Sequence, residues 1–254
     1  MSAIAHAGRS DVGRVRQENE DHWFADPEMG LYLVADGMGG ARAGGLASKA
    51  VVEVLPRLLR QKLKGIRHLD DPAATAQVLA ALREMSDRLQ NESRGKPGIS
   101  GLGSTVVLVL VSDRQSLVAH MGDSRAYLLH DRRLEQLTKD HSMCQLLVDC
   151  GEITPEEMKS HPARGQLTRF VGMRDKPLPE ARVAMLAPGD RLLLCTDGLS
   201  GMLSKEQLTD LLNQQSSPEE ACQALVAAAN EAGGKDNITV VVVSLPDGNP
   251  SSSH

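Results

Sequence analysis

Thr105-Val-Val-Leu-Val-Leu-Val111 is the stretch of sequence that decides the fold. Its apolar residues do not alternate with polar ones, so a strand here must be buried on both faces. Three more strand-like segments follow at 116–121, 125–130 and 134–137, separated by short turns that contain Asp, Arg or Gly. Such connections are typical of an antiparallel meander, and the stretch therefore predicts an interior strand of an antiparallel sheet.

Paired helices are predicted on both sides of this meander. The expected helices span 44–62, 72–91, 205–213 and 218–232, and the other expected strands span 23–24, 31–35, 191–195 and 238–245. Two antiparallel sheets covered by helices on their outer faces would bury all of these elements. We therefore predict an α+β fold, a four-layer αββα sandwich. A parallel doubly wound sheet is the weaker alternative, because strict strand–helix alternation is missing.

The chain has the size of one domain. Its 254 residues are 41% hydrophobic, enough for a substantial core, and we expect a single domain over residues 1–246. The pattern is irregular over 138–182, apart from a short amphipathic piece at 143–150 and a capped turn at 154–157, and this segment is the expected mobile flap. Residues 247–254 are predicted to be a disordered tail.

Composition disfavours several classes of partner. A formal charge of −5, the lack of a Lys/Arg block, and only one Trp, two Tyr and two Phe argue against nucleic acid. No apolar stretch approaches a membrane span and the N-terminus lacks a signal-peptide pattern, so we expect a cytoplasmic protein, with a monomer as the default. The four cysteines are expected to be reduced packing residues. A Cys144–Cys150 disulfide is disfavoured, because residues six apart on a helix lie on different faces.

Three aspartates lie where apolar runs meet a glycine or an asparagine. Asp36 and Asp197 follow the runs 31–34 and 192–195, and Asp236-Asn237 precedes the run 238–243. Carboxylates at the rim of buried strands, far apart in sequence, indicate one metal site assembled by folding. Oxygen ligands favour Mn²⁺ or Mg²⁺ over Zn²⁺.

Such a site suggests hydrolysis of a phosphoester. Two ions roughly 3.5–4 Å apart can share a bridging water, lower its pKa and present hydroxide in line with phosphorus. A cation is then needed for the other phosphate oxygens. Arg16, close before Glu20 and Asp21, is suited to bidentate contact, and a solvated loop charge is the alternative interpretation.

Seven motifs together resemble a known family. They are Arg16-x-x-x-Glu20-Asp21, Val34-Ala-Asp-Gly-Met-Gly-Gly40, Gly103-Ser-Thr105, His120-Met-Gly-Asp-Ser-Arg125, Thr138-Lys-Asp-His141, Cys195-Thr-Asp-Gly198 and Gly233-Gly-Lys-Asp-Asn237. In this order they resemble the metal-dependent serine/threonine protein phosphatases of type 2C, the PPM family, and its small bacterial members in particular. The match covers nearly the whole chain, whereas a single Asp-Gly is weak because it occurs in many turns.

The resemblance implies a role for each matching residue. Asp36 would bridge two Mn²⁺ or Mg²⁺ ions, with the Gly37 carbonyl as a further ligand, and Asp197 and Asp236 would bind the second ion. Glu20 and Asp21 would contribute directly or through water. Asp123 would hold a possible third ion, Arg16 would bind phosphate, and 138–182 would be the flap beside the site.

Several alternatives stay open at this point. Asp123 could instead be a hairpin residue bonded to Arg125. Met38 stands where many eukaryotic relatives have a histidine, the proposed general acid; it cannot donate a proton, so water at the metal or a flap residue such as His161 would have to serve. His120 and His141 are expected to be structural, and strand alternation should point His22 away from Asp21.

The implied function is a metal-dependent hydrolase acting on phosphoserine and phosphothreonine in proteins, opposing a bacterial serine/threonine kinase and its substrates. The alternative is not an enzyme but a catalytically silent adaptor that binds phosphoproteins. The absence of a metal-binding carboxylate from the sequence would indicate such an adaptor. No such carboxylate is missing. A phosphatase of a partner-switching pathway would share the chemistry and differ in substrate.

Overall fold

Two antiparallel sheets form the centre of the molecule. The computed structural model describes residues 4–39, 43–94, 102–174 and 177–247. Sheet 1 has the order β1 (Ala5–Asp11), β11 (Ile238–Ser244), β10 (Arg191–Cys195), β7 (Arg125–His130) and β8 (Arg133–Gln136). Sheet 2 has the order β2 (Asp21–Asp26), β3 (Leu31–Met38), β5 (Val106–Ser112), β6 (Gln115–Met121) and β9 (Glu180–Met185), and β4 (Gly103–Ser104) pairs with β3.

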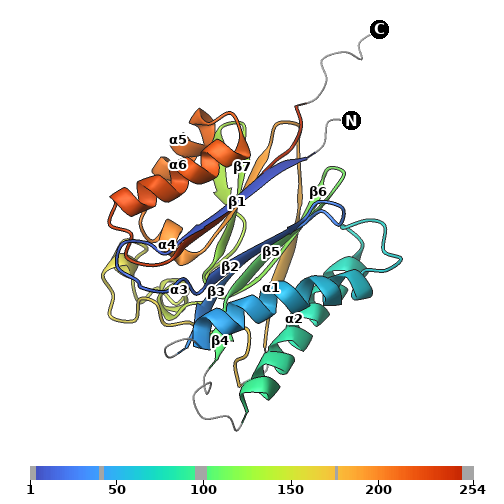
Figure 1. Cartoon of the computed structure of the whole chain (residues 1–254), viewed down its shortest axis with the longest axis horizontal. Helices are drawn as coiled ribbons and strands as arrows, with labels where there is room; N and C mark the ends of the chain where they lie inside the picture. Colours follow the sequence, from blue (N-terminus) through green and yellow to red (C-terminus); the bar gives the residue numbers. More distant parts are fainter. Residues whose placement is uncertain (1–3, 40–42, 95–101, 175–176, 248–254) are drawn as a thin grey trace.

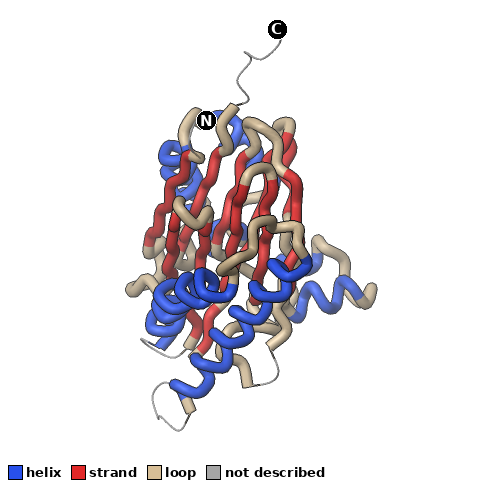
Figure 2. Tube along the Cα trace, turned by 90° about the vertical axis from the view of Figure 1, so that its right-hand side faces the viewer, coloured by secondary structure: helices blue, strands red, loops and turns tan. Residues whose placement is uncertain are grey.

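Helices cover the outer face of each sheet (Figures 1 and 2). The long helices α1 (Ala43–Lys62) and α2 (Pro72–Ser93) pack on sheet 2, while α4 (Asp197–Ser200), α5 (Lys205–Gln214) and α6 (Pro218–Glu231) pack on sheet 1. Helix α3 (Met143–Asp149) and the 3₁₀ turn η1 (Glu157–Lys159) belong to the segment between β8 and β9. The predicted four-layer αββα sandwich is confirmed.

The core explains the unbroken hydrophobic runs 31–35 of β3 and 106–111 of β5. Along β3, Leu31, Leu33 and Ala35 face the helices, whereas Tyr32 and Val34 pack between the sheets. Strand β5 alternates in the same way and is buried on both faces, as its sequence predicted. At roughly 1.5–3 kcal/mol for each large buried side chain, these two strands are among the main sources of stability.

Local signals set the ends of several elements. The turn from β7 to β8 uses Asp131 and Arg132 with φ of 46° and 63°, a left-handed pair suited to the twist of a two-residue hairpin. Helices α5 and α6 both begin with a capping box, at Ser204 and Ser217. The predicted capped turn is also present, because the Glu157 carboxylate accepts the Thr154 N–H at 2.7 Å.

Two edge strands correct the sequence prediction. Strand β1 was not expected, because Ala5–Asp11 carries no apolar run; it forms by pairing with β11 at the edge of sheet 1. Strand β9 begins at Glu180, so the irregular segment ends at residue 179 and not at 182. Neighbouring strands supplied order that the local sequence did not signal.

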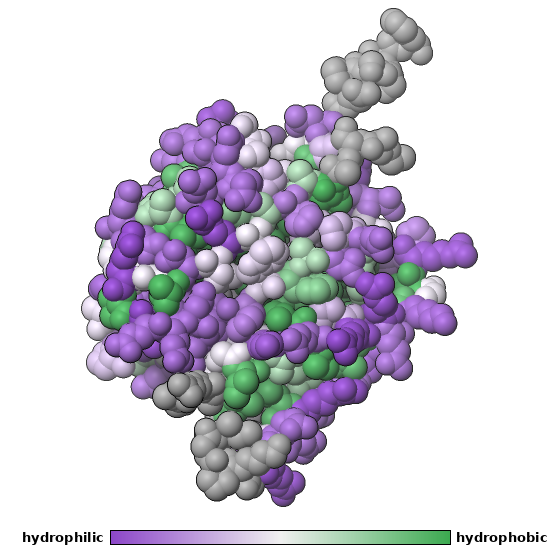
Figure 3. All heavy atoms as spheres, in the orientation of Figure 1, coloured by the Kyte–Doolittle hydropathy of each residue, from purple (hydrophilic) through white to green (hydrophobic). Residues whose placement is uncertain are grey.

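The remaining whole-chain predictions have simple outcomes. All four cysteines are free; Cys150 is exposed, so it is not the packing residue that was expected. Most of the predicted tail, 248–254, lies outside the described residues. Among the helices described, none combines the length and apolar character that a membrane span needs. Hydrophilic residues cover most of the face shown in Figure 3.

Candidate metal centre

Asp36 lies at the end of β3, where the surrounding backbone holds it firmly. Its N–H donates to Thr105 Oγ1 at 3.0 Å, and its carbonyl accepts from the Ser104 hydroxyl at 2.9 Å and from the Thr105 N–H at 2.8 Å. The Gly103-Ser-Thr105 motif therefore fixes the backbone that presents Asp36. Across the sheet, Asp21 at the start of β2 is the direct partner of Asp36.

Asp197 and Asp236 reach the same region from sheet 1. Asp197 opens α4 with one residue between it and β10, and one residue separates Asp236 from β11, the neighbour of β10. Glycine is required beside Asp197, because a Cβ on Gly198 would lie 1.9 Å from the Asn237 carbonyl oxygen. Figure 1 shows α4 and the end of β3 at the same end of the sandwich. Folding thus brings together residues that lie far apart in the sequence.

Asp123 joins this acidic group from the loop between β6 and β7. The adjacent Ser124 hydroxyl lies 2.7 Å from Thr105 Oγ1, which ties the loop to the backbone of Asp36. Arg125 directs its Nε and Nη2 hydrogens to Asp140, at 2.8 and 2.6 Å. The alternative in which Asp123 is the hydrogen-bond partner of Arg125 is therefore wrong.

Burial and mutual repulsion disfavour the ionised carboxylates. Burial is the main reason why the pKa of Asp21 and of Asp123 rises to about 7, and the neighbouring Asp197 charge adds to both shifts. The pKa of Asp36 is raised well above its usual range, by burial first and then by the other aspartates. Five carboxylates therefore share one electrostatic site, and a bound cation would relieve their repulsion.

Two buried carboxylate oxygens point to the same conclusion. Asp21 Oδ2 accepts the Thr196 hydroxyl at 2.9 Å, but Asp21 Oδ1 and Asp197 Oδ1 have no hydrogen-bond partner among the described residues. A buried acceptor without a partner costs about 1–3 kcal/mol, and more if it is charged. Hard oxygen donors in this state fit a divalent cation such as Mn²⁺ or Mg²⁺.

Glu20, Gly37 and Arg16 surround the acidic group. The Glu20 carboxylate accepts the Gly45 N–H in the first turn of α1 at 3.3 Å, and the Gly37 N–H donates to the Glu20 carbonyl at 3.1 Å. The Gly37 backbone is closely packed, since a Cβ there would lie 2.0 Å from the Gly44 oxygen. Arg16 Nη2 donates to Asp236 Oδ2 at 2.8 Å, so this half-exposed arginine lies beside the carboxylates.

Three supporting residues were missed as functional by sequence reasoning. Asn237 anchors the loop before β2 through three hydrogen bonds, and Thr196 accepts the Thr239 N–H at 3.0 Å while donating to Asp21. Asn237 and Thr196 both lie inside motifs quoted above, each next to a predicted metal ligand. This position was the signal in the sequence that could have identified them. Arg164, in the segment between β8 and β9, had no such signal in the sequence. Its guanidinium lies near Gly201, and its charge opposes the rise in the Asp197 pKa.

The histidines have local roles. His22 Nδ1 lies 3.0 Å from the Ser48 hydroxyl on α1, away from Asp21 as predicted. His120 and His141 both have hydrogen-bond partners, in line with the structural role expected for them. His161 Nδ1 accepts the Ala163 N–H at 3.1 Å and lies 3.8 Å from Cys144 Sγ. Met38 is the last residue of β3, and its side chain has no proton to donate.

Comparisons with known proteins agree with the motifs and the fold. A family model described as Protein phosphatase 2C matches residues 8–231. The serine/threonine protein phosphatase PstP of Mycobacterium tuberculosis is 39% identical over 249 residues, which are 96% of this chain and 45% of PstP. Protein phosphatase PhpP of Streptococcus pneumoniae is 33% identical over 243 residues, 93% of this chain and 95% of PhpP. The chain thus spans about half the length of the first relative and nearly all of the second.

Solved structures show the same architecture. A crystal structure of the Mycobacterium tuberculosis phosphatase PstP/Ppp has a TM-score of 0.82 at 37% identity, covering 96% of this chain and 100% of that chain. The catalytic domain of PstP in complex with two manganese ions also has a TM-score of 0.82, at 36% identity, with 96% and 99% covered. Stp1 from Staphylococcus aureus has a TM-score of 0.86 at 29% identity, with 96% of each chain covered.

Proposed function

Because this chain belongs to the protein phosphatase 2C family, we propose that it is a metal-dependent phosphatase that removes phosphate from phosphoserine and phosphothreonine in proteins. The observation that carries the proposal is the convergence of five aspartates on one end of the sandwich, with two buried carboxylate oxygens left without partners. An adaptor that had lost its chemistry would not need to maintain this costly arrangement.

The ligands would come from both sheets. Asp36 is proposed to bind both ions with the Gly37 carbonyl as a further ligand, and Asp197 and Asp236 to bind the second ion. Glu20 and Asp21 would assist directly or through water, and Asp123 would serve a third ion. When bound, Mn²⁺ or Mg²⁺ would activate a water and neutralise phosphate charge. A relative solved with two manganese ions supports this choice of cofactor.

Arg16 is proposed to bind the phosphate. In the structure its guanidinium is paired with Asp236 Oδ2 at 2.8 Å. A carboxylate oxygen has two lone pairs, so Asp236 Oδ2 can accept from Arg16 and still bind a cation, and this ion pair would hold the guanidinium beside a bound phosphate. The planar fork of arginine then suits two phosphate oxygens at once.

The substrates are proposed to be exposed phosphoresidues of proteins, and the partners a serine/threonine kinase and its targets. Relatives named serine/threonine phosphatase support this class of substrate. The irregular segment between β8 and β9 carries Arg164 beside Asp197, so it would contact a bound phosphoprotein. A monomer is sufficient for this chemistry, because one chain supplies every proposed ligand.

The test is hydrolysis of a phosphothreonine peptide by the purified chain in EDTA, Mg²⁺ or Mn²⁺. We expect turnover only with metal, and its loss in Asp36→Ala and Asp197→Ala. Arg16→Ala should lower kcat/KM by about tenfold, equivalent to about 1.4 kcal/mol of transition-state stabilisation. Asp113→Asn, an exposed aspartate in the turn after β5, is the matched control and should leave turnover unchanged.

Two results would contradict the proposal. Full activity of Asp36→Ala would place the metal centre elsewhere. Metal binding without turnover on several phosphopeptides would favour the adaptor. Asp123→Ala with an undiminished rate at saturating Mn²⁺ would show that this carboxylate is structural and would leave the two-ion centre intact.

A further inference from the structure

A hydrogen-bonded chain of side chains lies directly behind the loop that carries Asp123. His141 follows β8, and its backbone N–H donates to the Gly122 carbonyl at 3.0 Å. In return, the Gly122 N–H donates to His141 Nδ1 at 3.3 Å. On the other side of the ring, His141 Nε2 lies 3.5 Å from Glu180 Oε1 on β9. Three segments of the chain therefore meet at one imidazole.

The hydrogen bonds fix the tautomer of His141. Nδ1 accepts the Gly122 N–H, so it carries no hydrogen itself, and a neutral ring must then be protonated at Nε2. Burial lowers the pKa of His141 to about 4, which keeps the ring neutral at physiological pH. Arg169 Nη1 lies 3.3 Å from Nε2, but an arginine has only donors, and this nitrogen already donates to Glu180 Oε1 and to the Leu178 carbonyl. Glu180 Oε1, at 3.5 Å, is therefore the acceptor that faces Nε2. Glu180 thus determines which nitrogen is free to accept from Gly122.

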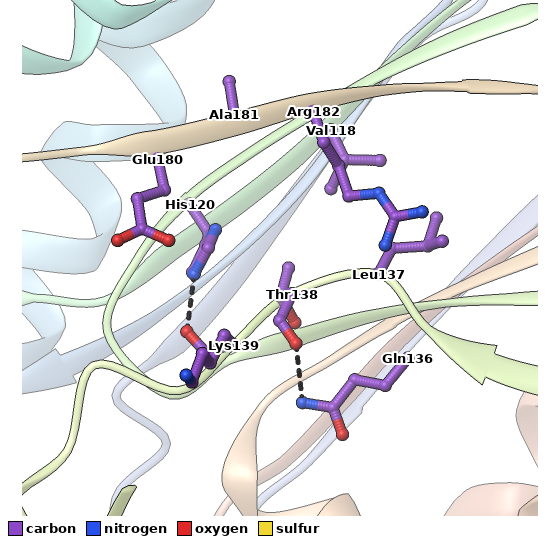
Figure 4. Close-up of a pocket in the computed structure, with 9 residues that line it drawn as sticks. All are labelled: Val118, His120, Gln136, Leu137, Thr138, Lys139, Glu180, Ala181 and Arg182. Carbon is purple, nitrogen blue, oxygen red and sulfur yellow. Dashed lines mark hydrogen bonds between the residues drawn. The ribbon is translucent and has the colours of Figure 1, made fainter. Parts of the chain in front are cut away.

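His120, on the strand β6 that leads into this loop, contacts His141. Its ring stacks on His141 at a centroid distance of 4.4 Å, and its Nε2 donates to the Lys139 carbonyl at 2.8 Å. Figure 4 shows His120 and Glu180 side by side on the wall of a cavity of about 310 Å³, with the bond to Lys139 drawn. None of the five aspartates is among the residues that line this cavity.

The backbone at Gly122 makes the position of Asp123 sensitive to this contact. Gly122 has φ of 110°, and a Cβ there would lie 2.6 Å from Thr105 Cγ2, so the loop turns sharply against the residue that holds Asp36. Glycine adopts this conformation without strain, but it is also the most flexible residue, so contacts with its surroundings set where the loop lies. The paired bonds to His141 are such contacts, one residue before the carboxylate.

His120, His141 and Glu180 also place three potential metal ligands within 4.8 Å of one another. The hydrogen bonds argue against an ion there. His141 Nε2 carries a hydrogen in the tautomer that Gly122 requires, and Arg169 Nη1 already donates to Glu180 Oε1 at 2.5 Å. An internal guanidinium thus occupies the carboxylate that an ion would need.

We propose that Glu180 and His141 are a positioning pair for Asp123. Glu180 accepts the His141 Nε2 hydrogen, which keeps Nδ1 free to hold the Gly122 N–H and so directs Asp123 toward the other aspartates. The pair contacts neither substrate nor the proposed ions. Only the readout through Asp123 rests on the proposed function, because it assumes that Asp123 helps to hold a metal ion.

The first test measures the tautomer and needs no activity. The ring nitrogens of His141 are observed by NMR of protein labelled with ¹⁵N-histidine, in EDTA. The wild type and Glu180→Gln, which keeps an acceptor oxygen, should show Nε2 protonated and Nδ1 free, whereas Glu180→Ala should show a mixture of tautomers. A wild-type His141 protonated at Nδ1 would overturn the proposal.

The second test measures the Mn²⁺ concentration for half-maximal hydrolysis of the phosphothreonine peptide. Glu180→Ala and His141→Phe, which keeps the stacked ring, should raise it by about tenfold, the usual scale for residues that orient a metal ligand. Glu180→Gln should restore the response to within about twofold. Arg182→Gln, on the same strand but paired with Glu135, is the control and should behave as wild type.

A double-mutant cycle separates this proposal from a general loss of structure. In an Asp123→Asn background, His141→Phe should raise the Mn²⁺ requirement no further, since the pair acts through that carboxylate. Fully additive effects would overturn the proposal. Added Co²⁺ gives a further check. An intense visible spectrum typical of tetrahedral Co²⁺ in the wild type, lost in His141→Phe, would identify the cluster as a metal site and would also overturn the proposal. If the wild type hydrolyses no phosphopeptide with any metal, the proposed function is wrong. The tautomer measurement still decides whether Glu180 and His141 are a positioning pair.

Discussion

The loop before β2 depends on one buried amide, and its removal is our main stability prediction. Asn237 is 6% exposed and makes three hydrogen bonds of 2.9 Å. Its Nδ2 donates to the carbonyls of Val12 and Glu18, and its Oδ1 accepts the Glu20 N–H. Asn237→Ala removes all three bonds and leaves their backbone partners behind.

The magnitude follows from these partners. A net hydrogen bond contributes about 0.5–1.5 kcal/mol, so three give about 3 kcal/mol at the centre of that range. Glu18 is exposed, so water can solvate its carbonyl once the bond is lost. We therefore place the contribution of that bond at the lower end of the range. For a domain of this size, about 3 kcal/mol corresponds to a fall in Tm of about 6–12 °C.

The measurement is urea unfolding followed by circular dichroism, with the free energy of unfolding compared at equal m-value. Asn230→Ala is the matched control. Asn230 is similarly buried at 8% exposed, and its amide donates one bond of 3.1 Å, to Asp11. We expect a loss of about 1 kcal/mol for Asn230→Ala, a third of that for Asn237→Ala.

A second variant tests the direction of the bonds. Asn237→Asp keeps an oxygen for the Glu20 N–H but offers no hydrogen to the two carbonyls, so it should lose most of the stability that Asn237→Ala loses. The same loop carries Arg16 and Glu20, so kcat/KM should fall in both variants. A loss below about 1 kcal/mol for Asn237→Ala, or one equal to that of Asn230→Ala, would refute the reasoning.

Three further predictions concern packing, metal and pH. Gly198→Ala should lower stability by about 1–3 kcal/mol, because its Cβ would lie 1.9 Å from the Asn237 oxygen; an unchanged Tm would contradict this close approach. Mn²⁺ at 100 times its Kd should raise the free energy of unfolding by about 2.7 kcal/mol over EDTA, and no shift in a thermal melt would argue against a site in the native state. The hydrogen bond to Asp190 raises the pKa of His130 above 6.5, so its stabilisation is complete below pH 6.5 and is lost as pH rises through the higher pKa. The Tm gap between wild type and His130→Gln should therefore be larger at pH 6 than at pH 9, and a gap that grows with pH would reverse the assignment.

The interior of the fold and the identity of the acidic residues were predictable from sequence. Residues 31–35 of β3 and 106–111 of β5 are hydrophobic at every position because each face packs against a different layer, and this pattern is local. An aspartate directly beside such a strand must lie at the rim of the sheet. Asp36, Asp197 and Asp236 could therefore be grouped by their sequence context alone, even though nothing in their spacing fixes how they meet.

Only the tertiary structure decided the edges and the partners. Ala5–Asp11 has no strand signal of its own and is ordered by hydrogen bonds to β11, which local propensity cannot report. Arg125 could have paired with Asp123, two residues away, but folding brings Asp140 to it instead. The link from Glu180 through His141 to Gly122 joins three distant segments, so its existence depends on how the two sheets are placed. Local patterns fix what is buried because burial repeats along one strand, whereas charge pairing and hydrogen bonding depend on distances that only the packed chain defines.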